Sequence, residues 1–438
     1  MLSDESIRNS ISPRPGTPGR GAGGEGLSEH HLHRDGILAP SAWICLVWFV
    51  VTPVAAQQTT ETAPPLAAET ELPYNQLPIR YSESTPRDPV SRLALRLERE
   101  EITLKRSGPS GVLKELLREL QVPVSSQLLV FSKSSAQAKL IKPTTPRAVY
   151  FNDDVYVGWV PGSSLIEISA ADPDLGGTFY SLQQPAEGEI QLRRDESCLL
   201  CHLTRHTLRV PGHLVRSFST DALGNMQAGW SRVNHETSFD KRWAGWYVTG
   251  RADALGHLGN VFGEASPAIR TPPPTGSPFD IKQRCDLSGY LSAESDVLPH
   301  LILDHQVHGH NLITRLNYEA RLQKPLTALE PLVRYLLFFD EVPLPAAVAG
   351  NADYRRWFEQ QGRRDPEGRS LRDFDLQTRL FKYRLSYLVT TPAFTALPAE
   401  PRGEVWKRIK NQLTRTGQTG KSILGIVRAT VPMLPEGW

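Results

Sequence analysis

The chain has 438 residues, a formal net charge of +2 and 39% apolar residues. This length is enough for two or three domains with buried cores, and the balanced charge gives no field that would by itself attract nucleic acid or an anionic membrane. The composition also argues against a coiled coil, a collagen-like rod, a fully disordered chain and a multi-pass membrane protein.

Residues 1–56 have the features of a targeting segment. A polar prefix over 1–36 precedes a segment over 37–56 whose continuous apolar core is Trp43–Val51. This core is short for a permanent transmembrane helix, which needs about 20 apolar residues. The segment ends in Val54–Ala56, small residues at the positions that a signal peptidase reads. We therefore expect a cleaved signal peptide and a periplasmic or otherwise exported protein. An uncleaved N-terminal membrane anchor is the alternative, and it is the only membrane contact we expect.

Residues 57–85 indicate a linker, and 86–124 indicate a region of N-terminal helices. Asp88 followed by proline is typical of an N-cap and a first helical position. The apolar spacing then predicts helices over 89–102 and 110–120.

Residues 125–266 indicate a β-rich domain. Short apolar runs that contain β-branched and aromatic residues alternate here with Gly, Pro and Asn, as in antiparallel strands joined by tight turns. The strands expected are 127–131, 148–151, 155–160, 165–169, 179–182 and 190–192, followed by a hairpin of 214–218 and 227–233.

After a Pro-rich linker over 267–290, residues 291–438 indicate a helical domain. The expected helices are 297–321, 332–339, 371–389 and 405–413, the second of them opened by a capping box of Thr327 and Glu330. The fold class predicted is therefore α+β, a mainly antiparallel sheet domain followed by an α-helical C-terminal region.

One short motif carries chemistry. Residues 198–202 read Cys198-Leu199-Leu200-Cys201-His202, the pattern for covalent attachment of c-type haem. Two thiols three positions apart reach the two vinyl groups of one haem, and the adjacent imidazole binds the iron. We expect one covalent haem c, held by Cys198 and Cys201, with His202 as the proximal iron ligand.

Two other interpretations of the motif stay open. A zinc site also starts with Cys-x-x-Cys, but Cys285 is the only other cysteine outside the targeting segment. A redox dithiol should open a helix after a strand in a βαβ unit, whereas the flanking sequence here indicates sheet and loop.

The sixth ligand of the iron has several candidates. His257 is the first, because it stands among small residues over 256–260 that would let the backbone approach a flat cofactor. His235 is the second distal candidate and His305 a weaker one, while Met226 lies in an expected turn and an open, five-coordinate iron is also possible. The expected helix that carries His305 has three more histidines, His300, His308 and His310, and a polar helix face packed on the sheet domain would explain all of them.

Aromatic side chains gather in the segment 242–250, where Trp243, Trp246 and Tyr247 stand beside glycines. A haem is large and apolar, so these three are candidates for its pocket. Ordinary core aromatics in a strand would give the same pattern. We find no convincing Ser/His/Asp order, phosphate-binding loop or dinucleotide fingerprint.

Beyond the motif, the chain resembles a family of exported proteins described only as cytochrome c-like. The resemblance implies covalent haem and export. The family also has histidines at the positions that match His235, His257, His305 and His310 of this chain. The chain departs from the family just after Gly250, where Arg251-Ala252-Asp253 replaces a histidine-containing segment. The strand-rich setting of the motif is also similar to PAS-like haem c sensor domains. Besides the haem motif, the segments that carry the resemblance are Leu128–Ser135, Pro146–Val160, Pro211–Ser217, Arg242–Gly250, His257–Asn260, His310–Arg315 and Asp375–Tyr387.

The sequence thus predicts an exported c-type cytochrome that transfers single electrons to a redox partner protein. We expect an electron carrier rather than a catalyst. The alternative is a peroxidase-like haem enzyme, or a redox or gas sensor, with an open or displaceable distal site.

Overall fold

A seven-stranded antiparallel sheet is the largest element of the computed structural model, which describes residues 70–261, 263 and 279–438. The expected signal segment, much of the first linker and most of the Pro-rich linker lie outside these residues. All the described residues belong to one compact unit. Within them, no helix combines the length and the apolar character needed to cross a membrane.

The sheet confirms the predicted α+β fold class. All its neighbouring strands run antiparallel, in the order β6-β5-β4-β3-β2-β1-β9. The first six strands along the chain coincide with expected ones, whereas β9 comes from the aromatic segment and adds an edge strand beside β1. The strands are β1 (Leu128–Val130), β2 (Arg147–Phe151), β3 (Val155–Trp159), β4 (Leu165–Asp172), β5 (Gly176–Gln183), β6 (Gln191–Arg194) and β9 (Trp246–Tyr247).

Both faces of the sheet are covered. Side chains alternate between the faces, and the face with Tyr150 and Val157 shares one apolar cluster with α1 (Pro89–Glu98) and α2 (Leu113–Glu119). The opposite face, which includes Phe151, shares a larger cluster with the C-terminal helices. The sheet is thus an inner layer of the protein.

The expected start of α1 is confirmed. The Asp88 carboxylate accepts hydrogen bonds from the backbone N–H groups of Val90 (2.7 Å) and Ser91 (2.9 Å), which are otherwise unpaired at a helix N-terminus. It also accepts hydrogen bonds from the hydroxyls of Thr178 (2.9 Å) and Tyr180 (2.5 Å) on β5. One buried carboxylate therefore both caps α1 and ties it to the sheet.

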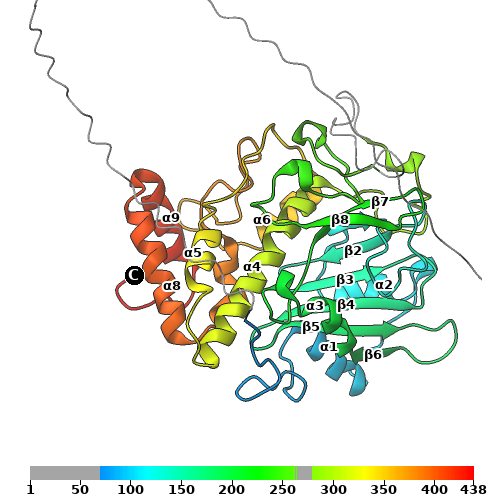
Figure 1. The fold of residues 1–438 in the computed structure, drawn as a ribbon, viewed down its shortest axis with the longest axis horizontal. Helices are drawn as coiled ribbons and strands as arrows, with labels where there is room; N and C mark the ends of the chain where they lie inside the picture. The colour runs from blue at the N-terminus through cyan, green and yellow to red at the C-terminus, as the bar shows by residue number, and fades with distance from the viewer. Residues whose placement is uncertain (1–69, 262, 264–278) are drawn as a thin grey trace, which may run out of the picture. The chain divides into compact units, whose positions relative to one another are not determined.

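The long helix α4 (Val297–Arg321) begins and ends where the sequence predicts, with Asp296 as its N-cap. It crosses the molecule between the sheet and the helices α5, α8 and α9 (Figure 1). Almost every residue of α4 is buried, as in a helix with protein on all sides. Its polar side chains are buried with partners, as when Gln306 Nε2 donates to the hydroxyl of Tyr156 at 2.8 Å.

The remaining helices complete the C-terminal region. The expected helix 405–413 is confirmed within α8, and α6 and α9 were not expected. The helices that follow α4 are α5 (Leu329–Leu336), α6 (Ala352–Gln360), α7 (Pro392–Thr395), α8 (Ala399–Thr414) and α9 (Gly417–Thr430).

The helix expected over 371–389 is wrong. Turns, an isolated β-bridge between Phe374 and Phe381, and a short 3-10 helix near the end occupy this segment. The Asp375 carboxylate accepts hydrogen bonds from the backbone N–H groups two and three positions later, both at 2.7 Å. Such a local side-chain bond favours a turn over a helix, and the aromatic residues still reach the core.

The capping box expected before α5 is also wrong. Ala328 is the N-cap, and it has no side-chain cap. The hydroxyl of Thr327 donates to Glu319 at the end of α4, whose other carboxylate oxygen accepts from the Ala328 N–H at 2.9 Å. Glu330 pairs with Arg408 at 2.7 Å. A carboxylate from the preceding helix therefore takes the role that we assigned to Thr327 and Glu330.

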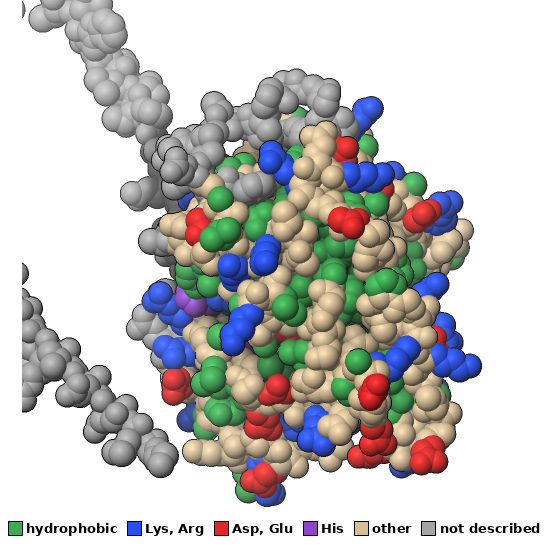
Figure 2. Space-filling view, turned by 90° about the vertical axis from the view of Figure 1, so that its right-hand side faces the viewer, with side chains coloured by type: hydrophobic (Ala, Val, Ile, Leu, Met, Phe, Trp, Pro, Cys, Tyr) green, Lys and Arg blue, Asp and Glu red, His purple; other side chains and the backbone are tan. Residues whose placement is uncertain are grey.

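The expected hairpin is present as β7 (Arg216–Thr220) and β8 (Met226–Arg232), which form a sheet of their own. A backbone hydrogen bond from Phe218 to Ala244 (2.8 Å) links β7 to the segment before β9. On the face that Figure 2 shows, side chains of both charge signs are interspersed, in agreement with the small net charge.

Candidate haem site

The motif forms a short helical segment at the protein surface. A 3-10 turn (Glu196–Cys198) runs into the four-residue helix α3 (Leu199–His202). Leu199 packs inward, whereas Leu200 is 85% exposed. Cys198 is half-buried and Cys201 is exposed, and both are free thiols. Residues three positions apart on a helix share a face, so both thiols are accessible on one side of α3.

The His202 ring has a fixed orientation. Its Nδ1 lies 2.9 Å from the carbonyl oxygen of Gly212, and its ring packs on Phe179 of β5 with 4.7 Å between centroids. A carbonyl oxygen only accepts, so Nδ1 carries the proton. Burial lowers the pKa of His202 to about 4, which keeps the imidazole neutral and leaves Nε2 with a free lone pair. This is the tautomer that binds a metal through Nε2.

The backbone around His202 reinforces this geometry. The Gly212 N–H donates back to the carbonyl oxygen of His202 at 2.9 Å, and the hydroxyl of Thr207 reaches the same oxygen at 3.2 Å. Two backbone segments ten residues apart are therefore joined by reciprocal bonds. The side chain and the main chain of His202 are both fixed.

Two arginines lie close enough to affect the motif electrostatically. The charges of Arg216 and Arg147 both help to lower the pKa of His202, after the larger effect of burial. Arg147 crosses the position of Gly158, where a Cβ would lie 2.1 Å from its Nη2, and it forms an ion pair with Glu167 at 3.2 Å. Guanidinium groups bind carboxylates well, so Arg216 suits a carboxylate at the edge of a haem, whereas Arg147 already pairs with Glu167.

Apolar side chains are also exposed near the motif. Trp230 of β8 packs on His206, just after the motif, with 4.3 Å between ring centroids, and it is 37% exposed. Met226 on the same strand is exposed, as is Leu200 within the motif. Trp230 therefore links the hairpin β7–β8 to the segment that follows the motif.

The structure does not bring His257 onto His202. His257 packs on Trp243, which directly precedes β9, with 5.1 Å between ring centroids. His202 packs on β5, and four strands separate β5 from β9 in the sheet order. The Nδ1 of His257 accepts from the Gly259 N–H at 2.9 Å, so the proton lies on Nε2, a buried atom without a hydrogen-bond partner in the described residues. Burial lowers the pKa of His257 to about 4.

His235 and His305, the other two histidine candidates, bind each other. Their Nδ1 atoms are 2.7 Å apart, and His305 Nε2 lies 2.7 Å from the hydroxyl of Ser386. Both rings stack on Tyr335, with centroid distances of 3.9 Å and 5.2 Å. His305 therefore uses both ring nitrogens, and only the Nε2 of His235 is left without a partner among the described residues.

The three aromatic candidates for the pocket lie on both sides of β9. Trp243 donates from its indole to Asp304 of α4 at 3.0 Å, and Trp246 donates to the backbone carbonyl of Arg216 at 2.8 Å. Tyr247 points to the other face and donates to a proline carbonyl at 2.7 Å. Trp246 is therefore the one that is bonded directly to the hairpin beside the motif.

The histidines of α4 are buried among partners of their own. His300 bonds the carbonyl oxygen of Tyr247 at 2.9 Å, and His310 bonds that of Asp153 at 2.9 Å. Across the part of the chain that the structure describes, no three His, Cys, Asp or Glu side chains are grouped to hold a metal ion. The acceptors of His300 and His310 lie in β9 and in the β2–β3 turn, as expected for a polar helix face packed on the sheet domain.

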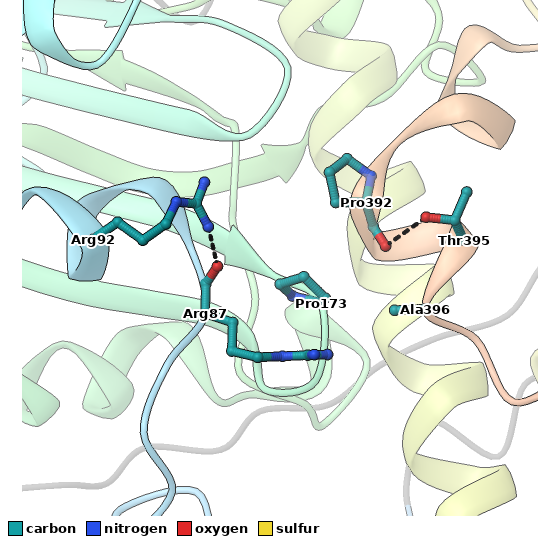
Figure 3. Close-up of a pocket in the computed structure, with 6 residues that line it drawn as sticks. All are labelled: Arg87, Arg92, Pro173, Pro392, Thr395 and Ala396. Carbon is teal, nitrogen blue, oxygen red and sulfur yellow. Dashed lines mark hydrogen bonds between the residues drawn. The ribbon is translucent and has the colours of Figure 1, made fainter.

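A cavity of about 480 Å³ lies away from the motif, between α1, the β4–β5 turn and α7 (Figure 3). On the α1 side of the cavity, the Arg92 guanidinium donates to the backbone carbonyl of Arg87. None of the predicted site residues borders this cavity. The lining residues are Arg87, Arg92, Pro173, Pro392, Thr395 and Ala396.

Sequence reasoning missed the residues that surround His202. Gly212 lies in one of the segments that carry the resemblance, and its carbonyl gives no sequence signal for a bond to a histidine. Arg216 stands in the predicted strand 214–218 and Arg147 directly precedes the predicted strand 148–151, where an arginine is usually a solvated residue. Only the alternation of side chains along a strand gives a hint, because it places Arg147 on the same face as Phe151.

Comparisons of the chain with known protein families, with curated proteins and with solved structures find no match. No relative therefore supplies a fold name or an activity. The resemblance to cytochrome c-like proteins stays a prediction, and the function has to be argued from the chemistry of the site.

Proposed function

We propose that the chain is an exported c-type haem protein that carries one haem, bonded to Cys198 and Cys201 and ligated by His202. The observation that carries this proposal is the 2.9 Å contact between His202 Nδ1 and the Gly212 carbonyl. It leaves Nε2 as the free nitrogen of a neutral imidazole, next to two accessible thiols. A proximal haem histidine needs this arrangement.

The residues present fit the attachment chemistry. Each thiol adds across one vinyl group, so that a carbon–sulfur bond forms and the thiol hydrogen moves to the neighbouring vinyl carbon, with no oxidant required. Burial, assisted by the charges of Asp195 and Glu167, raises the pKa of Cys198 to about 11 and keeps it a thiol at neutral pH. Arg216 would pair with a carboxylate of the group. When bound, haem supplies one-electron chemistry.

The most direct use of such a site is electron transfer to another redox protein. The motif is at the surface, Leu200 is exposed, and the hairpin beside it presents Trp230 and Met226 to solvent. A partner would approach along this side. The expected targeting segment 1–56 supports export, and haem is attached to c-type proteins outside the cytoplasm.

A second candidate function follows from the positions of the histidines. His257, His235 and His305 are each occupied by contacts elsewhere in the fold, so none of them is presented to His202 in the described residues. An open sixth position would suit a gas or redox sensor, or a peroxidase-like enzyme. Carbon monoxide separates the two functions: a closed, six-coordinate carrier leaves the Soret band of the ferrous protein unchanged, whereas an open site shifts it.

The proposal is tested by haem content. We expect the protein, produced in a host that matures c-type cytochromes, to be coloured, to keep its haem on a denaturing gel and to have one haem in its intact mass. Replacing both Cys198 and Cys201 with Ala should remove the covalent haem. Cys285→Ala is the matched control, and it should leave haem content unchanged. The Cys285 thiol is buried in the apolar cluster that the sheet shares with α1 and α2. A colourless wild-type protein would refute the proposal.

A further inference from the structure

A single peptide group connects the haem motif to the long helix α4. Its carbonyl is that of Gly212, which lies 2.9 Å from His202 Nδ1. Its N–H is that of His213, which donates to Asn311 Oδ1 at 2.9 Å. Donors and acceptors thus follow one another from the imidazole, through this peptide group, to the side-chain amide of α4.

Asn311 makes two hydrogen bonds to the backbone of His213. Besides accepting from the His213 N–H, its Nδ2 donates to the His213 carbonyl at 2.8 Å. The side-chain amide therefore satisfies both the N–H and the carbonyl of one residue, as a neighbouring strand does in a sheet. Asn311 is fully buried, so no water competes for these bonds.

The loop is packed too tightly to take another position. A Cβ at Gly212 would lie 2.3 Å from Asn311 Oδ1, so only glycine fits beside the amide. On the other side, Gly177 of β5 donates to the Pro211 carbonyl at 2.8 Å, and a Cβ at Gly177 would come within 2.9 Å of the Gly212 nitrogen. The acceptor for His202 is thus clamped between the sheet and α4.

Such a chain of hydrogen bonds has an electronic consequence. A peptide group whose N–H donates to a good acceptor is polarised, and its carbonyl becomes a better acceptor. A histidine that donates more strongly from Nδ1 is a more basic ligand through Nε2. A more basic ligand favours the oxidised iron, so it lowers the reduction potential.

We propose, on the basis of the haem site above, that Asn311 is a positioning residue for the proximal ligand. It orients the Gly212 carbonyl toward His202 and polarises it, and so keeps the reduction potential of the haem low. The α-helical C-terminal region thereby takes part in tuning a cofactor that is bound on the sheet side of the molecule. Asn311 itself contacts neither thiol nor imidazole.

The test is the midpoint potential of Asn311→Ala, measured by spectroelectrochemical titration together with haem content. Covalent haem should be retained, because the thioether bonds do not involve Asn311. At the wild-type midpoint, we expect the ratio of reduced to oxidised haem to rise severalfold; a tenfold rise corresponds to about 59 mV. Asn311→Asp keeps the oxygen that accepts from His213, and it should bring the potential back toward the wild-type value.

Asn317→Ala is a matched control. Asn317 is a buried asparagine on the same helix, and its Nδ2 donates to the backbone carbonyl of Pro173 at 3.0 Å. Losing this bond should cost stability without changing the potential. If Asn311→Ala does not fold, Asn311→Leu fills a similar volume, removes both bonds and takes its place.

The outcomes separate the two proposals. A wild-type protein without haem refutes the proposed function, and the role of Asn311 with it. Haem in every variant, with equal potentials for the wild type and Asn311→Ala, overturns only the role of Asn311. An equal shift in Asn317→Ala also overturns it, because a general loosening of α4 would then explain the change.

Discussion

Acid should destabilise the fold through its buried histidines, and His300 allows this to be measured. Its side chain is buried, and its Nε2 lies 2.9 Å from the carbonyl oxygen of Tyr247. Burial lowers the pKa of His300 to about 3, against about 6.5 in an unfolded chain. Below pH 6.5 the unfolded chain therefore binds a proton that the folded protein does not. The stability is complete above pH 6.5 and is lost progressively as the pH falls toward 3.

The size of the effect follows from these two pKa values. Each unit of difference is worth about 1.4 kcal/mol, so His300 alone would cost at most about 5 kcal/mol at pH 3. Between pH 7 and pH 5 the same relation gives a loss of about 2 kcal/mol. His300→Gln removes the titration, and the glutamine amide can still donate to the Tyr247 carbonyl.

Urea unfolding at pH 7 and pH 5 measures the difference. The free energy of unfolding of the wild type should fall by about 2 kcal/mol more than that of His300→Gln over this interval. The other buried histidines are present in both proteins, so their contributions cancel in the comparison. Equal losses in the two proteins would show that His300 is not held neutral by the fold, and the reasoning would be refuted.

Three further changes test other parts of the structure. Gly212→Ala brings a methyl group against Asn311 and should cost about 1–3 kcal/mol in urea unfolding; an unaltered midpoint would mean that the loop moves freely. Glu319→Ala leaves the buried Arg315 without the carboxylate that lies 2.7 Å from it and should cost about 3–5 kcal/mol. A thermal midpoint within 2 °C of the wild type, by the usual scaling of roughly 2–4 °C per kcal/mol, would contradict that cost. Leu200→Ser changes an exposed side chain and should alter stability by less than about 0.5 kcal/mol, with haem content unchanged; a loss of haem would show that this leucine packs on the cofactor.

Much of the secondary structure is encoded locally, and there the sequence predicts it well. The helix α4 is delimited by Asp296 at its start and by a continuous apolar spacing to Arg321, so its bounds need no tertiary information. The segment 371–389 has similar apolar spacing but is not helical. Its Asp375 bonds the following backbone and forms a turn, and the long-range packing of Phe374 on Phe358 (5.1 Å between ring centroids) fixes the rest. Tertiary contacts outweigh helical periodicity in this segment.

The candidate site divides in the same way. The thiols and His202 are contiguous, so their spacing alone predicts them. The acceptor on Gly212 and the amide of Asn311 meet only because β5 and α4 enclose one loop, and no periodicity in either segment indicates this. The choice among His257, His235 and His305 likewise depends on where the tertiary structure places the element that carries each residue. The sequence identifies these three histidines as candidate ligands but does not give their distances from the motif.

The position of α4 determines how the protein can be divided. A 25-residue helix is about 37 Å long, and this one supplies the wall against which the sheet buries Phe151 and Tyr156. A fragment that stops before residue 297 would leave that apolar face open to solvent and prone to aggregate. Proteolysis of the intact protein should accordingly release no soluble sheet fragment, and the sheet should persist only while the C-terminal helices remain attached.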